Sequence, residues 1–335
     1  MKKLIFGIIL LFAIMATIPA MVSIPKADLF SVFSASKADT SANRAENKEQ
    51  ETEKPSEPTE ADFLLLEENG EKTAYTAKEM LCGMLAAKMP ENYSEESAKA
   101  LAAALYSQLC YAKENRSPDK YDGADTAKKD SCGISFLTKQ EAAEKYGGDF
   151  CDACEKYADF GIKTSIKYGG KIIDAPVFVS CGGSTNSADE LFTDKDLPYC
   201  KSSSSPWDMY GDIYSKKELT RGQADKAITD KLSGAQLPEE ISDYVKIKST
   251  ARNGAVLEAE ICGKSISGIE LMNIFSLKSP CFEIEYDDDK LRFSVTGEGI
   301  PVGMSVSGAA GMAQQGAQWD DIMRHYFSGC EITKN

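Results

Sequence analysis

Lys88 is the residue on which the chemistry of this chain depends. It ends a predicted helix directly before Met89-Pro90. Three carboxylates follow within the next eight residues, those of Glu91, Glu95 and Glu96. A carboxylate there could exchange a proton with a substrate near neutral pH, whereas a lysine has an unperturbed pKa of about 10.4 and stays protonated. Lys88 is therefore either a solvated lysine that suits the negative end of a helix or a group whose pKa burial lowers.

Cysteine is the second residue type whose spacing could support chemistry. The chain has 10 cysteines, and Cys151 and Cys154 have the CxxC spacing. Three interpretations stay open for this pair: a structural disulfide or two buried thiols, half of a metal site completed by Cys132, and a redox dithiol. A second CxxC or a histidine pair would favour a metal, but the single histidine is His325. We expect no metal site and no cofactor.

Two helices must position Lys88. Thr76 and Glu79 have the spacing of a capping box, and apolar residues then recur at helical spacing until Pro90 ends the run. Ser94 is a good N-cap for a second helix, whose apolar stripe contains Ala98, Leu101, Ala102, Leu105 and Leu109. The sequence therefore predicts an elbow between two helices, with Lys88 at the end of the first.

The elbow also carries a family resemblance. The chain reads Ala87-Lys88-Met89-Pro90 and then Glu96-Ser97-Ala98-Lys99-Ala100-Leu101-Ala102. This resembles the start of the sporulation stage II protein D/LytB amidase-enhancer (SpoIID/LytB) domain. The resemblance implies that Lys88 stands where the family has its catalytic glutamate, the acid of a lytic transglycosylase. Many members also carry a zinc-binding cysteine pair with a histidine before the second cysteine. Here only Cys132 matches, and Ser131 replaces the histidine.

A second block of the resemblance follows a predicted pair of strands. Thr164, Ile166 and Tyr168 alternate, Gly169-Gly170 is a hairpin turn, and residues 172–179 continue as a strand. The family then shows Ser-Gly-Gly-x-Thr, Pro-Tyr-Leu and Ser-Pro-Trp-Asp. This chain has Cys181 for the serine and Cys200 for the leucine, and it keeps Ser205-Pro206-Trp207-Asp208.

This block implies part of a glycan-binding site. Glycines would let a sugar approach backbone amides, and Trp207 could stack on a sugar face. A turn beside a buried tryptophan is the alternative for Trp207. The residues expected to bind glycan are Ser180, Cys181, Gly182, Gly183, Thr185, Ser205 and Trp207.

A third block completes the resemblance, which covers roughly residues 73–332. The family's Gly-His-Gly-Val-Gly-Met-Ser-Gln-Tyr-Gly-Ala is present with four replacements, namely Ile300, Pro301, Val306 and Ser307. We expect Gly303, Met304 and Ser305 to complete the glycan-binding set. His325 matches a family position before two aromatics, and we interpret it as a packed or capping histidine.

The remaining segments favour an α+β fold. A helix is predicted after Thr138, another over residues 220–232, and strands near 245–249, 256–262, 282–286 and 291–295. The aspartates between the last two strands lack the spacing of a calcium loop and predict a solvated hairpin turn. By resemblance we expect antiparallel sheet between the helices. A groove should lie between the elbow, the Gly182-Gly183 turn and the Met304-Ser305 turn.

The N-terminal segment predicts attachment to a membrane. Residues 4–25 carry no charge over 22 residues and follow two lysines, which is long enough to cross a hydrocarbon core of roughly 30 Å. We expect an uncleaved single-pass anchor over residues 1–25, with a cleaved signal peptide as the alternative. Residues 26–62 are polar and rich in Pro, Glu and Ser, which predicts a flexible tether. The domain over residues 63–335 would then be extracytoplasmic.

The net charge of the chain limits the classes of partner it can bind. The formal net charge of −14 argues against a nucleic-acid partner and against an anionic membrane surface. The leading hypothesis is a SpoIID/LytB-like protein without transglycosylase activity that binds peptidoglycan glycan strands or assists another wall hydrolase. The runner-up is an active lytic transglycosylase that uses a displaced carboxylate such as Glu91. A third hypothesis makes the cysteines the functional groups, in redox chemistry or metal binding.

Overall fold

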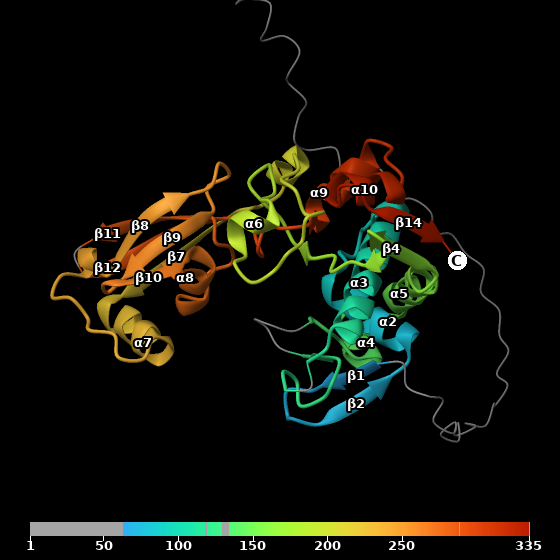
Figure 1. The fold of residues 1–335 in the computed structure, drawn as a ribbon, viewed down its shortest axis with the longest axis horizontal. Helices are drawn as coiled ribbons and strands as arrows, with labels where there is room; N and C mark the ends of the chain where they lie inside the picture. The colour runs from blue at the N-terminus through green and yellow to red at the C-terminus, as the bar shows by residue number, and fades with distance from the viewer. Residues whose placement is uncertain (1–62, 118, 129–133, 288, 335) are drawn as a thin grey trace, which may run out of the picture. The chain divides into compact units, whose positions relative to one another are not determined.

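The computed structural model describes residues 63–117, 119–128, 134–287 and 289–334 (Figure 1). The predicted anchor, the predicted tether, Ser131 and Cys132 lie outside these residues. Within them, no helix is both long enough and apolar enough to span a bilayer. The described chain combines helices with several small sheets, which confirms the predicted α+β class.

The predicted elbow is present. Helix α2 (Ala77–Lys88) starts at the capping box of Thr76 and Glu79, and helix α3 (Glu95–Glu114) starts at Ser94. The backbone leaves α2 at Met89 in an extended conformation, as expected before a proline. The faces that the apolar spacing predicted are buried in the larger of two hydrophobic cores.

A helix that the sequence analysis did not predict supports the elbow. Helix α5 (Gly148–Gly161) carries the CxxC pair and packs against both α2 and α3. A Cβ atom on Gly161 would lie 2.7 Å from Leu81 Cδ2 and 2.9 Å from the carbonyl oxygen of Ala102. Only glycine allows this close approach. Helix α4 (Lys139–Tyr146) starts at the predicted cap, Thr138, and packs beside α5.

Three small sheets border these helices. The predicted hairpin is confirmed: β4 (Thr164–Tyr168) pairs with β5 (Lys171–Ile172), and Gly169 and Gly170 both have positive φ. Strand β14 (Glu331–Lys334) pairs with the other edge of β4. The second sheet joins β1 (Phe63–Leu66), β2 (Lys72–Tyr75) and β3 (Thr126–Ala127). The third pairs β6 (Val177–Phe178) with β13 (Met304–Ser305) in parallel.

Residues 213–297 build the second hydrophobic core, which contains Tyr244, Phe275 and Phe293. One sheet has the order β11-β12-β7 and the other β10-β9-β8, and Figure 1 draws both with α7 and α8. Asp287 pairs with Lys290, so the aspartate run turns a hairpin as predicted. The elements are β7 (Tyr214–Thr220), α7 (Arg221–Lys231), η2 (Ile241–Asp243), β8 (Val245–Thr250), β9 (Val256–Ile261), β10 (Lys264–Ser267), α8 (Gly268–Ile274), β11 (Phe282–Asp287) and β12 (Lys290–Thr296).

Four short helices complete the fold. They are α6 (Ala188–Leu191), η1 (Pro206–Tyr210), α9 (Val306–Gln314) and α10 (Trp319–Tyr326). Helix α9 contacts α3, α10 and η1, and α10 also contacts α3. Three segments that are distant in the sequence therefore meet: the elbow, the Trp207 segment and α9.

Candidate functional site

An open groove of about 780 Å³ lies where these three segments meet. One wall comes from the elbow and the other from Trp207, Gly211 and helix α9. The lining residues are Pro90, Glu91, Asn92, Tyr93, Trp207, Gly211, Val306, Ser307, Ala310, Gly311, Gln314 and Gln315. The predicted groove thus includes the elbow and the helix after the Met304-Ser305 turn. The Gly182-Gly183 turn is not among its lining residues, so this part of the prediction is wrong. A Cβ atom on Gly183 would lie 3.1 Å from Met209 Sδ.

Glycines on α9 bring that helix against Trp207. A Cβ atom on Gly311 would lie 2.2 Å from Trp207 Cβ. One turn earlier, a Cβ on Gly308 would lie 2.1 Å from the hydroxyl oxygens of both Ser205 and Tyr326. Trp207 is half-buried, and its ring meets that of His325 edge to face at 6.3 Å. The packing holds the indole in place while part of it lines the groove.

A buried polar cluster, Cys181, Asp208 and Ser305, lies behind Trp207. Asp208 Oδ2 accepts a hydrogen bond from Cys181 Sγ at 3.0 Å, and Oδ1 accepts one from Ser305 Oγ at 2.6 Å. Ser305 Oγ accepts from the backbone N–H of Gly308 at 3.0 Å and so caps α9. Burial raises the pKa of Asp208 despite these hydrogen bonds, because desolvation disfavours the carboxylate. The cluster joins the second and third motif blocks, because Cys181 and Asp208 belong to the second and Ser305 to the third.

Two tyrosines attach further elements to the groove. The hydroxyls of Ser205 and Tyr326 lie 2.8 Å apart. Tyr93 donates its hydroxyl to the carbonyl oxygen of Val306 at 2.8 Å, which ties the elbow to α9. Burial raises the pKa of Tyr93 and of Tyr326, so both stay protonated and can donate.

Most residues expected to bind glycan have side chains inside the protein. Those of Ser180, Cys181, Thr185, Ser205, Met304 and Ser305 are buried. Gly183 and Gly303 have φ of +95° and +85°, and a Cβ on Gly303 would lie 2.2 Å from the Pro176 carbonyl oxygen. Their contact with glycan stays a prediction. Trp207 is the member of the set that lines the groove.

The groove also contains residues that the sequence analysis did not select. Asn92, Gln314 and Gln315 bring amide groups to it, and Tyr93 brings a ring. The two glutamines follow the third motif block directly, and Asn92 and Tyr93 follow Pro90. Their position next to recognised motifs was the signal that could have identified them.

Lys88 lies beside the groove's elbow wall in sequence but is not a lining residue. It sits in the last turn of α2 and is half-buried. Burial lowers the pKa of its ammonium group. Within the part of the chain that the structure describes, no hydrogen bond or ion pair engages this group.

The nearby carboxylates differ in availability. Glu95 pairs with Lys99 at 3.0 Å and with Lys156 at 3.3 Å. Glu96 pairs with Lys99 at 2.7 Å and accepts from the backbone N–H of Trp319 at 2.9 Å. Glu91 is exposed. Among the described residues that line the groove, it is the one that carries a carboxylate.

Comparison with known proteins finds relatives that are named for sporulation. No family model matches the chain. It is 27% identical over 261 residues to stage II sporulation protein D of Bacillus subtilis, covering 77% of this chain and 74% of that protein. It is 29% identical over 264 residues to stage II sporulation protein D of Bacillus amyloliquefaciens, with the same coverage. Over about three quarters of its length the chain is similar to stage II sporulation protein D.

The divergence from the stage II sporulation protein D pattern extends into the groove. Val306 and Ser307 stand where the family pattern has glutamine and tyrosine, and both line the groove. Ile300, in the place of the family histidine, packs against the larger core. The described residues contain no cluster of three or more side chains placed to hold a metal ion. Cys132, which the resemblance matched to the family's zinc motif, lies outside those residues.

Proposed function

We propose that this stage II sporulation protein D relative binds peptidoglycan glycan strands without cleaving them, and assists another wall hydrolase during sporulation or wall remodelling. The observation that carries the proposal is a groove that keeps Trp207 and several amides while a lysine holds the position of the family's acid. Aromatic rings and amide groups suit sugar rings and their acetamido and hydroxyl substituents. The relatives' names refer to stage II of sporulation.

The chemistry of lysine supports a protein without transglycosylase activity. A lytic transglycosylase must protonate the glycosidic oxygen and then, as a carboxylate, accept the proton of the sugar hydroxyl that closes the anhydro ring. Burial lowers the pKa of Lys88, which makes proton exchange easier. However, its protonated form would place a positive charge next to an oxocarbenium-like transition state. Loss of a general acid alone lowers the rate by roughly 10²- to 10⁴-fold.

A second candidate function rests on Glu91. Its exposed carboxylate lines the groove, whereas Glu95 and Glu96 are held in ion pairs. Under this alternative the protein is an active lytic transglycosylase with a displaced acid. It would release products with anhydro-sugar ends, and Glu91→Gln would abolish them.

The membrane attachment and extracytoplasmic location remain part of the proposal. They rest on the uncharged segment at residues 4–25, which lies outside the described residues. Fractionation of the native cells tests them: a membrane-associated, externally protease-sensitive protein supports the proposal, and a cytoplasmic protein contradicts it.

Co-sedimentation with purified glycan strands tests the proposed binding. We expect the full-length protein to sediment with glycan. Trp207→Ala should lose most of that retention, because the indole could no longer stack on a sugar ring. Tyr214 is exposed and does not line the groove, so Tyr214→Ala serves as the matched control and should bind normally. The proposal fails if the protein neither sediments with glycan nor changes the rate of a partner hydrolase.

A further inference from the structure

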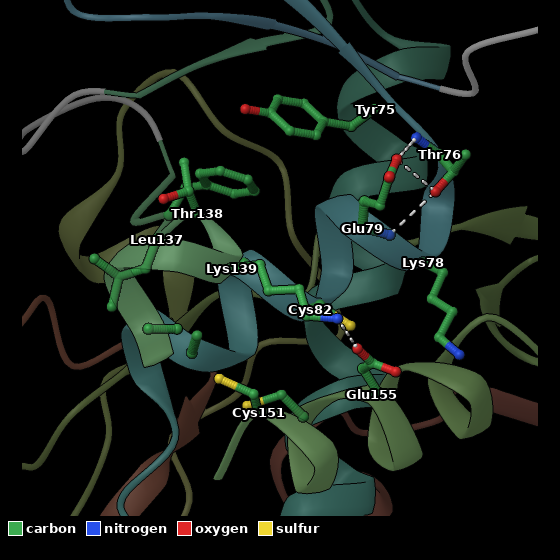
Figure 2. A pocket seen from close by; sticks show the side chains of 15 residues that line it. Tyr75, Thr76, Lys78, Glu79, Cys82, Leu137, Thr138, Lys139, Cys151 and Glu155 are labelled. Carbon is green, nitrogen blue, oxygen red and sulfur yellow. Dashed lines mark hydrogen bonds and ion pairs between the residues drawn. The ribbon is translucent and has the colours of Figure 1, made fainter. Parts of the chain in front are cut away.

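A cavity of about 470 Å³ lies away from the groove and is lined by three cysteines. Its walls come from α2, α4, α5 and the segment 136–138. Cys82 belongs to α2, and Cys151 and Cys154 belong to α5. Figure 2 shows Cys82 and Cys151 on different helices around this space. The CxxC pair is therefore joined by a third thiol that is 69 to 72 positions earlier in the sequence.

The two helices that carry the cysteines are packed closely. Lys78, one turn before Cys82, pairs with Asp159 of α5 at 2.9 Å. Gly161 lets α5 approach Leu81, the residue next to Cys82. Cys154 is seven residues, or two helical turns, before Gly161, so it lies on the face of α5 that approaches Leu81. Cys151 is rotated away from that face, so Cys154 is the better-placed partner for Cys82.

The arrangement suits a bond between two sulfurs better than a shared metal ion. Although three thiols line one cavity, no group of three metal-ligating side chains among the described residues is placed to hold an ion. All three thiols are free in this structure. Lys139 and Glu155 also line the cavity, where they pair with each other at 2.9 Å, and both side chains reach solvent.

We propose that Cys82 and Cys154 form a disulfide that links α2 to α5 when the protein meets a low-molecular-weight disulfide, leaving Cys151 as a free thiol. The thiolate of one cysteine attacks the reagent's S–S bond and releases one reagent thiol. The second cysteine then attacks the mixed disulfide and releases the other reagent thiol. The protein loses two protons and two electrons, and these reduce the reagent to two thiols.

The link would act on the helix that leads into the groove. Cys82 is in the middle of α2, and the same helix ends at Lys88, two residues before the first groove-lining residue, Pro90. The bridge closes a loop of about 70 residues, which restricts the unfolded chain and raises the thermal midpoint by about 5–10 °C.

Peptide mapping of the full-length protein tests the bridge. The protein is incubated with excess oxidised glutathione at pH 9, because burial raises the pKa of the Cys82 thiol to about 11 and the thiolate is the reacting form. After alkylation of free thiols, trypsin and an Asp-specific protease separate the cysteines into peptides 79–88, 149–151 and 152–156. We expect peptide 79–88 to be linked to peptide 152–156.

Serine variants provide the matched controls. The link should persist in Cys151→Ser and in Cys262→Ser, which is outside the cavity, and it should disappear in Cys82→Ser together with the shift in thermal midpoint. A main product that links 149–151 to 152–156 would overturn the proposal. So would the recovery of glutathione adducts alone. Because the mapping uses the native chain, a variant that fails to fold does not affect the result.

Discussion

Replacing Asp208 should destabilise the protein strongly, because this carboxyl holds the cluster behind Trp207 together. Asp208→Ala leaves the buried thiol of Cys181 without its acceptor, which costs about 1–3 kcal/mol. Ser305 loses its 2.6 Å hydrogen bond and keeps only the Val179 carbonyl oxygen at 3.3 Å, which costs about 0.5–1.5 kcal/mol more. The expected loss in free energy of unfolding is therefore about 1.5–4.5 kcal/mol. Asp208→Asn keeps one acceptor oxygen and the side-chain shape, so its loss should be smaller.

The pH dependence of this difference gives a sharper test. Burial raises the folded-state pKa of Asp208 above its value of 3.8 in a free chain. A carboxyl with a raised pKa contributes its full stability below the unfolded pKa and loses it as the pH rises through the folded pKa. Each unit of this shift corresponds to about 1.4 kcal/mol. The stability gap between the native protein and Asp208→Asn should therefore shrink as the pH rises from about 4 to 7.

Urea unfolding measures these free energies. The slope of the free energy of unfolding against urea concentration is compared between variants, to confirm that each exposes the same surface on unfolding. A double-mutant cycle with Ser305→Ala should show a coupling of about 0.5–3 kcal/mol, because the two side chains share a hydrogen bond of 2.6 Å. The reasoning is refuted if Asp208→Ala unfolds within about 1 kcal/mol of the native protein. A gap that widens with rising pH would also refute it.

Three further predictions concern the groove and the helices that support it. Gly311→Val should push Trp207 away from α9, because even a Cβ atom at position 311 would lie 2.2 Å from Trp207 Cβ. Glycan retention in co-sedimentation should therefore fall. Unchanged retention would show that the position of the indole does not matter for binding. Gly161→Ala should reduce the free energy of unfolding in urea by about 1–3 kcal/mol through its clash with Leu81, and equal stability would contradict the packing described above. Glu91→Gln should leave glycan binding intact and yield the same products by mass spectrometry as the native protein; a loss of anhydro-sugar products would instead establish Glu91 as an acid.

Local signals in the sequence were sufficient for much of the fold. The capping boxes at Thr76 and Thr138 and the turn at Gly169-Gly170 depend on residues only a few positions apart, and all three are present as predicted. Helix α5 was missed because it begins at Gly147-Gly148, and its buried face is defined by α2 and α3 rather than by a local pattern.

The site was less predictable because its parts meet only in three dimensions. Trp207 was selected from its motif and does line the groove. Its neighbours Asp208 and Ser305 are 97 residues apart and meet by a hydrogen bond that no spacing rule reveals. The Gly182-Gly183 turn was expected in the groove, but glycine at position 183 is needed for a φ of +95° against Met209. A motif glycine can thus mark a backbone requirement rather than a ligand contact.

Product analysis of glycan strands treated with the full-length protein tests the central claim most directly. The strands are analysed by mass spectrometry for anhydro-sugar ends, with Lys88→Glu treated in parallel. We predict that the native protein binds the strands and leaves them uncut, and that cleavage gained by Lys88→Glu locates the lost acid at this residue. Anhydro-sugar ends produced by the native protein would contradict the account.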